Sequence, residues 1–239
     1  MASPAYEQIL NVQALDLSLR QLRHQYEQHP IRQELVANDS QISEIDARLT
    51  DVDERRHDLE RRRKRFEDEA GSMKTKRASI EQKLYGGEVT GSKELLALQD
   101  EETMLKGKQD ELEEQEIEVM EELESVDAER DEIRVGRDQL AELRAALESD
   151  LEMALGEIET DIGAVVHQRA DAVEGADPAL LERYEQLRDS YDGVAVARLV
   201  NGSCDGCHIQ LSAVAVDQMT KMADDAVVTC EECGRLLVH

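Results

Sequence analysis

Aromatic residues are nearly missing from this sequence. Its 239 residues include no tryptophan, one phenylalanine and five tyrosines, whereas 35% of them are charged. Large aromatic side chains contribute much of the buried area of a globular core. A chain of this composition is therefore expected to bury a narrow apolar seam and not a broad core.

Proline is also scarce, and its placement leaves a long stretch without a helix breaker. The three prolines are Pro4, Pro30 and Pro178, so 147 consecutive residues separate the last two. Proline removes a backbone donor and clashes inside a helix. A stretch without it, rich in leucine, alanine and charged residues, indicates long helices.

The sequence lacks the features that direct a chain to a membrane. Its first residues, MASPAYEQIL, contain no basic segment followed by an apolar run. No apolar run reaches the roughly 18 residues that a membrane-spanning helix needs. We therefore expect a cytoplasmic protein without membrane contact. The formal net charge of −27 also opposes nonspecific attraction to nucleic acid.

Apolar residues recur every seven positions in both halves of the proline-free stretch. The first half contains the series Ile45, Val52, Leu59, Phe66, Met73 and Ile80. The second half contains the series Leu98, Leu105, Leu112, Val119, Val126, Ile133, Leu140 and Leu147. Sustained repeats of this period predict two coiled-coil helices.

Glycines separate the two repeats, in the segment LYGGEVTGSKEL at residues 84–95. Gly86 and Gly87 permit the backbone conformations of a turn, and Ser92 is suited to cap the next helix. A short loop between long helices makes them antiparallel neighbours. We therefore predict a mainly α fold, with an antiparallel coiled-coil hairpin over residues 1–175, a kink at Pro30 and a tip near residues 85–93.

Charge supports the antiparallel pairing. Residues 55–83 contain 11 Lys/Arg and six Asp/Glu, a net charge of +5, whereas residues 88–132 contain four and 18, a net charge of −14. Reflection about the loop places the run RRRKRF (61–66) near DELEEQE (110–116). It also places two seam arginines opposite a polar stretch of the partner seam, namely Arg63 and Arg77 opposite Glu102, Gln109 and Glu116.

The basic run has two interpretations. Its members are Arg61, Arg62, Arg63, Lys64 and Arg65. They are candidates for contacts with nucleic acid, but consecutive helical residues point in every direction, and an acidic helix lies alongside. We therefore favour a structural role in helix pairing.

All four cysteines lie in two pairs near the end of the chain. Cys204 and Cys207 are followed, after 22 residues, by Cys230 and Cys233. Four thiolates in two such turns surround one Zn²⁺ tetrahedrally and leave no position open, so the sequence predicts one structural zinc ion. Tight C-x-x-C pairs also favour metal over disulfides in a reducing compartment. The histidines His208 and His239 are expected to be bystanders.

The region around the cysteines reads as a small β-rich zinc ribbon over residues 195–239. Residues 176–194 form a lead-in helix and linker before it. Three strands and a helix are expected, at residues 194–200, 226–230, 236–238 and 212–223. Each C-x-x-C pair is expected to lie on a tight turn, here called a knuckle. Gly234 follows the last cysteine and fits the left-handed backbone conformation that such a turn requires.

Other chemistry finds little support in the sequence. A thioredoxin-like role for either cysteine pair requires a βαβ setting, which is missing. No Ser/His/Asp set, phosphate loop or His-Glu-x-x-His motif occurs. We therefore expect a protein that is not an enzyme.

These motifs resemble a known family. The long helical hairpin, the Lys93-Glu94-Leu95 tip and the closing CEECGRLL together resemble the bacterial C4-type zinc-ribbon family with an N-terminal coiled-coil hairpin. The resemblance covers essentially the whole chain and implies a binding protein. In some relatives it implies contact with transcription machinery, including an alternative sigma factor, or with RNA.

Our leading hypothesis is a noncatalytic adaptor that binds a protein partner through the ribbon, the hairpin tip or both. The tip candidates are Tyr85, Gly86, Gly87, Lys93 and Glu94. Nucleic-acid binding by the ribbon or by residues 55–83 is the alternative, which a net charge of −3 over residues 195–239 disfavours. A third hypothesis places the hairpin in a channel of RNA polymerase. A monomer and a dimer are both compatible with the pattern.

Overall fold

This computed structural model describes residues 4–87, 89–222 and 226–238. These residues contain five α-helices, a short 3-10 helix and three strands. Two compact units divide the chain: Glu34–Leu147, here the hairpin unit, and Met1–Gln33 with Glu148–His239, here the ribbon unit. The elements are α1 (Pro4–Glu27), α2 (Pro30–Tyr85), α3 (Ser92–Glu174), α4 (Pro178–Arg188), η1 (Asp189–Tyr191), β1 (Val196–Val200), β2 (Ser203–Cys204), α5 (Ala213–Lys221) and β3 (Leu236–Val238).

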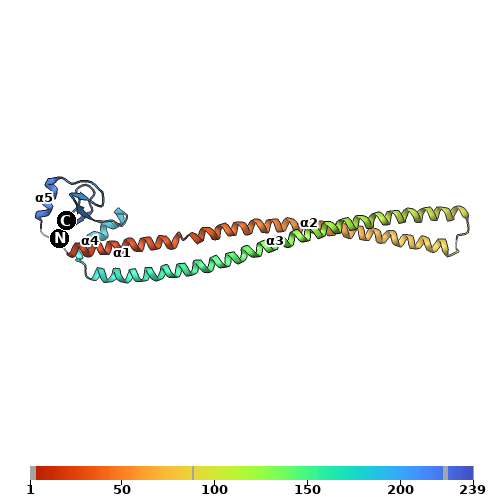
Figure 1. Cartoon of the computed structure of the whole chain (residues 1–239), viewed down its shortest axis with the longest axis horizontal. Helices are drawn as coiled ribbons and strands as arrows, with labels where there is room; N and C mark the ends of the chain where they lie inside the picture. Colours follow the sequence, from red (N-terminus) through yellow and green to blue (C-terminus); the bar gives the residue numbers. More distant parts are fainter. Residues whose placement is uncertain (1–3, 88, 223–225, 239) are drawn as a thin grey trace. The chain divides into compact units, whose positions relative to one another are not determined.

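In the hairpin unit, α2 and α3 run side by side in opposite directions and are joined at the glycine loop (Figure 1). Each apolar residue of the two seven-residue series is buried or half-buried. The most deeply buried side chains form one core between the helices: Val52, Leu59, Phe66, Ala70, Leu112, Val119, Val126 and Ile133. The predicted antiparallel coiled-coil hairpin is confirmed.

Ion pairs on the flanks of the seam fix the register of the two helices. Three pairs follow one another at seven-residue spacing: Asp39–Arg144, Asp46–Arg137 and Asp53–Arg130. Nearer the loop the signs reverse, and arginines of α2 meet acids of α3: Arg55–Glu129, Arg56–Asp127 and Arg62–Glu122. Opposite charges therefore face one another on both sides of this reversal.

The register differs from the one that reflection about the loop predicted. The basic run lies beside the segment around Glu122, roughly two helical turns from residues 110–116. The cause is an asymmetric loop, because α3 runs past the end of α2 at the tip (Figure 1). Arg77 nevertheless meets predicted partners, since its guanidinium donates to Glu102 at 2.7 Å and to Gln109 at 2.9 Å.

The expected kink at Pro30 is a break between two helices. α1 ends at Glu27 and α2 begins at Pro30. Proline suits the first position of a helix, where its missing N–H is not needed. The backbone turns there, and the Arg32 N–H donates to His29 O at 3.0 Å.

In the ribbon unit, α1, α4 and the sheet share one apolar core. α4 begins at an Asp177 cap, whose side chain accepts hydrogen bonds from two backbone N–H groups of the first turn. The deeply buried members of this core come from all three parts of the unit: Tyr6, Ile9, Val12, Leu180, Tyr184, Ala195, Val196, Leu236 and Val238. The ribbon is therefore packed on α1 and α4.

The sheet has the strand order β2-β1-β3. β1 and β2 are antiparallel and joined at Asn201-Gly202, which have φ values of 51° and 79°. These values are typical of the type I′ turns that connect hairpin strands. β1 and β3 are parallel, with Val196 opposite Leu236. The predictions of strands at 194–200 and 236–238 are confirmed.

The segment at residues 226–230, predicted as a strand, is not one. Thr229 forms an isolated bridge to Leu236. Two of the preceding backbone groups are bonded to a side chain instead: the Tyr6 hydroxyl donates to Ala226 O at 2.8 Å and accepts from the Val228 N–H at 3.1 Å. The predicted helix at 212–223 is present as α5, and residue 223 lies outside the described residues.

Within the described parts of the chain, we find no helix whose length and apolar content would suit it to crossing a membrane.

Candidate metal centre

The two cysteine pairs lie on turns with the same backbone hydrogen bonds. In the first knuckle, the His208 N–H donates to Cys204 O at 2.7 Å, and the Cys204 N–H donates to Ile209 O at 3.1 Å. In the second, the Gly234 N–H donates to Cys230 O at 2.8 Å, and the Cys230 N–H donates to the carbonyl of residue 235 at 2.9 Å. The two knuckles are thus built alike.

Each knuckle turns through a left-handed residue directly after its second cysteine. Gly234 has a φ of 76°, as predicted for this position, and His208 has a φ of 62°. A left-handed conformation is easy for glycine and costs other residues about 1 kcal/mol or more. His208 is exposed and outside the cysteine cluster. His239 lies outside the described residues.

The four cysteine sulfurs are close enough to share one metal ion. Their Sγ atoms all lie within 4.8 Å of one another, and those of Cys207 and Cys230 are 3.9 Å apart. Zinc bound to four thiolates at about 2.3 Å separates the sulfurs by about 3.8 Å. The set Cys204, Cys207, Cys230 and Cys233 therefore fits one structural Zn²⁺, and the predicted cofactor is confirmed.

Burial and hydrogen bonding together make the thiols of this site differ in acidity. Burial raises the pKa of Cys204 to about 12 and raises that of Cys230 as well. Burial also opposes ionisation of Cys233, but hydrogen bonds from the backbone and side chain of Arg235 outweigh it and lower its pKa to about 7. Since zinc binds thiolates, loading the site releases protons, and zinc affinity falls at acid pH.

Arg235 closes the second knuckle against the rest of the ribbon unit. Its Nε donates to Val194 O at 2.6 Å, and its guanidinium carbon lies 4.6 Å from the centre of the Tyr191 ring. A side chain at Gly206 would meet the Arg235 Cδ at 2.7 Å. The first knuckle therefore needs a glycine at position 206, because a larger residue would clash with the Arg235 side chain.

The tip candidates lie in the hairpin unit. Tyr85 ends α2 and is 87% exposed. Gly86 donates its N–H to Gln82 O, and Gly87 has a φ of 76°, so the two glycines end the helix. Lys93 and Glu94 are exposed in the first turn of α3. Residue 88 lies outside the described residues.

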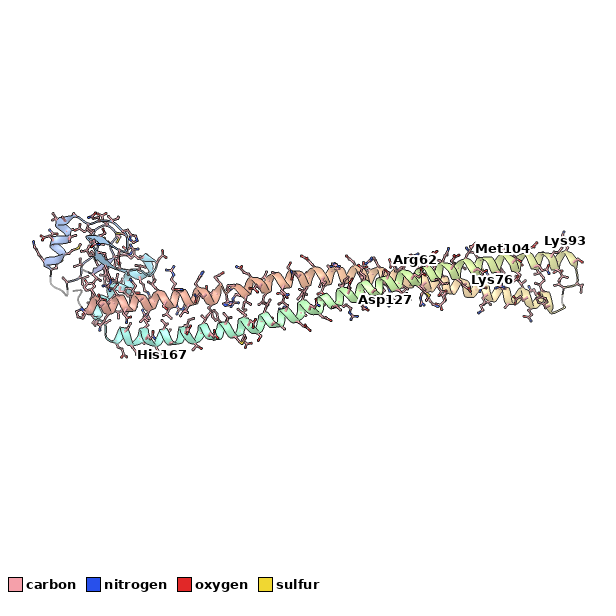
Figure 2. The ribbon with its side chains drawn as sticks, in the orientation of Figure 1. Arg62, Lys76, Lys93, Met104, Asp127 and His167 are labelled. Carbon is pink, nitrogen blue, oxygen red and sulfur yellow. The ribbon has the colours of Figure 1, made fainter. Side chains whose placement is uncertain are left out.

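The basic run is largely neutralised by neighbouring acids. Arg62, labelled in Figure 2, donates across the helix pair to Glu122. Three of the others pair within α2, in the ion pairs Arg61–Asp58, Lys64–Asp68 and Arg65–Glu69, and Arg63 is half-buried at its seam position. The arrangement supports the structural interpretation of this run.

Sequence reasoning missed the residues of α1 that hold the ribbon. The side chains of Tyr6, Glu7 and Gln13 are bonded to ribbon residues, and Asp16 accepts from Arg169 at 2.6 Å and from the Tyr184 hydroxyl at 2.8 Å. The only hint was polar residues among the apolar positions of α1. Nothing in their spacing indicated partners 150 or more residues away.

Comparison with known proteins gives two family matches. The model of the CT398-like coiled coil hairpin domain matches residues 12–192, and that of the C4-type zinc ribbon domain matches residues 203–237. An uncharacterized protein found in two strains of Mycobacterium tuberculosis is 32% identical over 184 residues, which are 73% of this chain and 71% of that protein. The resemblance inferred from the motifs is confirmed.

Solved structures share the fold. A protein from Mycobacterium smegmatis is 26% identical with a TM-score of 0.86, over 100% of this chain and 99% of that one. CT398 from Chlamydia trachomatis is 22% identical with a TM-score of 0.68, over 98% and 96%. The HP0958 protein from Helicobacter pylori is 20% identical with a TM-score of 0.52, over 99% and 98%.

Proposed function

This chain belongs to the family of CT398-like coiled-coil hairpin proteins, and we propose that it is a noncatalytic adaptor that binds a protein partner through the tip of its hairpin. The metal centre supports the noncatalytic part of the proposal. Four cysteines fill the coordination sphere of zinc and leave no position for a substrate or a reactive water. The family resemblance suggests a partner in the transcription machinery, which stays a prediction.

The exposure of Tyr85 is the observation that carries the proposal. Tyr85 is 87% exposed at the end of α2, and Leu96, one turn into α3, is 61% exposed. Tyrosine and leucine add nothing to the hairpin core from such positions. Tyrosine is enriched at the centres of protein interfaces, because its ring offers a large contact area and its hydroxyl a hydrogen bond.

A crosslinking experiment in the organism that produces the protein tests the tip. A photoreactive amino acid at position 85 is expected to capture one specific protein. The same amino acid at position 36 is the matched control, because Val36 lies in the same unit and is 70% exposed. Equal capture at both positions, or none at position 85, would contradict binding at the tip.

Paired variants separate the tip from general surface effects. Tyr85→Ser with Leu96→Ser is expected to lose the partner in a pull-down with the full chain. Val36→Ser with Val135→Ser, which also removes two exposed apolar side chains from the hairpin unit, is expected to retain it. A partner retained by both variants would place the binding surface elsewhere.

A further inference from the structure

The first half of α1 is bonded to the zinc ribbon at three places. The residues involved are separated by 183 to 222 positions in the sequence. On α1 they are Tyr6, Glu7 and Gln13, which lie within two turns of the same helix. Each meets a different part of the ribbon, and two of the three reach a cysteine knuckle.

Tyr6 reaches the second knuckle. Its hydroxyl donates to Ala226 O at 2.8 Å and accepts from the Val228 N–H at 3.1 Å. Val228 comes two residues before the ligand Cys230, and its carbonyl accepts from the Leu237 N–H at 2.9 Å. The tyrosine is 2% exposed. Its hydroxyl therefore fixes the backbone that leads into the buried ligand Cys230.

Glu7 reaches the first knuckle through Arg198. Both oxygens of the Glu7 carboxylate accept from the Arg198 guanidinium at 2.7 Å. The backbone of Arg198 is in turn hydrogen-bonded to Asp205, which lies between Cys204 and Cys207. The Asp205 N–H donates to Arg198 O at 3.0 Å, and Asp205 Oδ1 accepts from the Arg198 N–H at 2.5 Å. Arg198 thus links Glu7 to the first knuckle.

Gln13 takes the place of a neighbouring strand beside β1. Its Nε2 donates to Val196 O at 2.9 Å, and its Oε1 accepts from the Val196 N–H at 2.7 Å. Gln13 is 7% exposed and Val196 is 1% exposed. A buried backbone group left without such a partner is costly. The Gln13 side chain therefore satisfies two backbone groups of β1, the strand that pairs with β2 and contains Arg198.

We propose that Tyr6 and Glu7 are positioning residues of the zinc centre, so that docking of α1 and binding of zinc strengthen each other. The ribbon's own core is small and lacks aromatic side chains, and two of its buried members are the ligands Cys204 and Cys230. Metal and α1 together order the knuckles. Coupling between two sites is reciprocal, so residues that hold α1 on the ribbon also raise its zinc affinity.

The second half of α1 is anchored independently of the ribbon. Asp16 is bonded to Arg169 of α3 and Tyr184 of α4, and the Tyr26 hydroxyl donates to Glu159 at 2.9 Å. The coupling therefore ends within the helix. Loss of zinc loosens the turns around Tyr6 to Gln13 and leaves the turns near Tyr26 in place.

Zinc affinity is the first test, measured on the full chain by competition with a chromogenic zinc chelator. Tyr6→Phe removes the hydroxyl and keeps the ring. Tyr26→Phe makes the same change on the same helix away from the ribbon. We expect zinc binding to weaken about fivefold or more in Tyr6→Phe and to stay at the parental value in Tyr26→Phe. Equal affinities of the two variants would overturn the proposal.

A charge exchange tests the Glu7 contact with a built-in rescue. Glu7→Arg places two cations together and is expected to weaken zinc binding. Adding Arg198→Glu restores an opposite-charge pair and is expected to recover most of the affinity. A double variant no better than the single one would show that Glu7 acts on the helix alone and not on the metal centre.

Hydrogen exchange locates the end of the coupling. On removal of zinc, backbone amides of residues 8–13 are expected to exchange faster, and those of residues 20–27 to keep their rates. Unchanged exchange at residues 8–13 would contradict the proposal. An equal increase along all of α1 would contradict the independent anchor at Asp16.

Discussion

Arg137 and Asp46 meet across the seam of the hairpin, with the arginine Nε 3.1 Å from the aspartate Oδ1. The same pairing recurs one heptad to either side, as Asp53–Arg130 and Asp39–Arg144. Each pair is partly exposed and contributes little to stability by itself. Their shared contribution is to register, because a shift of the helices by a few residues separates all three.

Reversal of one charge in this ladder gives the first prediction. Asp46→Arg places two arginines together and is expected to lower the free energy of unfolding by about 0.5–1 kcal/mol at low salt. Adding Arg137→Asp is expected to recover most of that loss. Urea unfolding at low and high salt measures both effects, and a loss that salt does not reduce would argue against an electrostatic cause.

Asn38 gives the second prediction, because it occupies the seven-residue series one step before Ile45. It is 3% exposed, and neither its Oδ1 nor its Nδ2 is bonded to another described residue. A buried polar group without a partner costs about 1–3 kcal/mol. Asn38→Leu is therefore expected to stabilise the chain by a similar amount.

Thermal and urea unfolding measure this gain. Asn11→Leu, at an exposed position of α1, serves as the control and is expected to change stability by less than about 0.5 kcal/mol. A destabilised Asn38→Leu protein would mean that the asparagine selects the helix register, as polar seam residues do in other coiled coils.

The environment of Asp16 predicts a dependence of stability on pH. Burial alone would raise the pKa of Asp16, but hydrogen bonds from Arg169 and Tyr184 and the charges of Arg169 and Arg188 lower it. A carboxyl whose folded pKa lies below its unfolded value of about 3.9 contributes stability above that value. That contribution is lost as the pH falls below about 4.

Asp16→Asn isolates this contribution. It is expected to cost about 1–3 kcal/mol at pH 7, and the difference between the two proteins should shrink as the pH falls below about 4. The comparison is made on zinc-free protein at every pH, because acid also removes the metal. A difference that stays constant with pH would assign the effect to packing.

His208 gives the fourth prediction, because it holds the position that Gly234 holds in the other knuckle. Its φ of 62° is unfavourable for any residue with a Cβ. His208→Gly is expected to stabilise the zinc-loaded protein by roughly 0.5–1 kcal/mol. Gly234→Ala is the opposite test and is expected to destabilise it, since a Cβ there would lie 2.8 Å from the Tyr191 hydroxyl.

The elements that sequence predicts well here depend on local patterns. The spacing of neighbouring residues is enough to predict three features: the heptads at Val52 and Val119, the glycine turn at Gly87 and the cysteine knuckles. The segment at 226–230 shows where this fails. Its β-branched residues favour a strand, but two of its backbone groups, Ala226 O and the Val228 N–H, are bonded to the distant Tyr6 hydroxyl.

The antiparallel pairing of two helices and the binding of a metal by four cysteines follow from the amino-acid sequence alone, because repeats and short spacings encode these features locally. The register of the helices and the packing of α1 on the ribbon are known only from the three-dimensional arrangement of the chain. The loop is asymmetric, so no reflection about it locates Glu122 beside Arg62. The contacts of Tyr6, Glu7 and Gln13 join residues some 200 positions apart, and their hydrogen bonds depend on where the whole chain brings them.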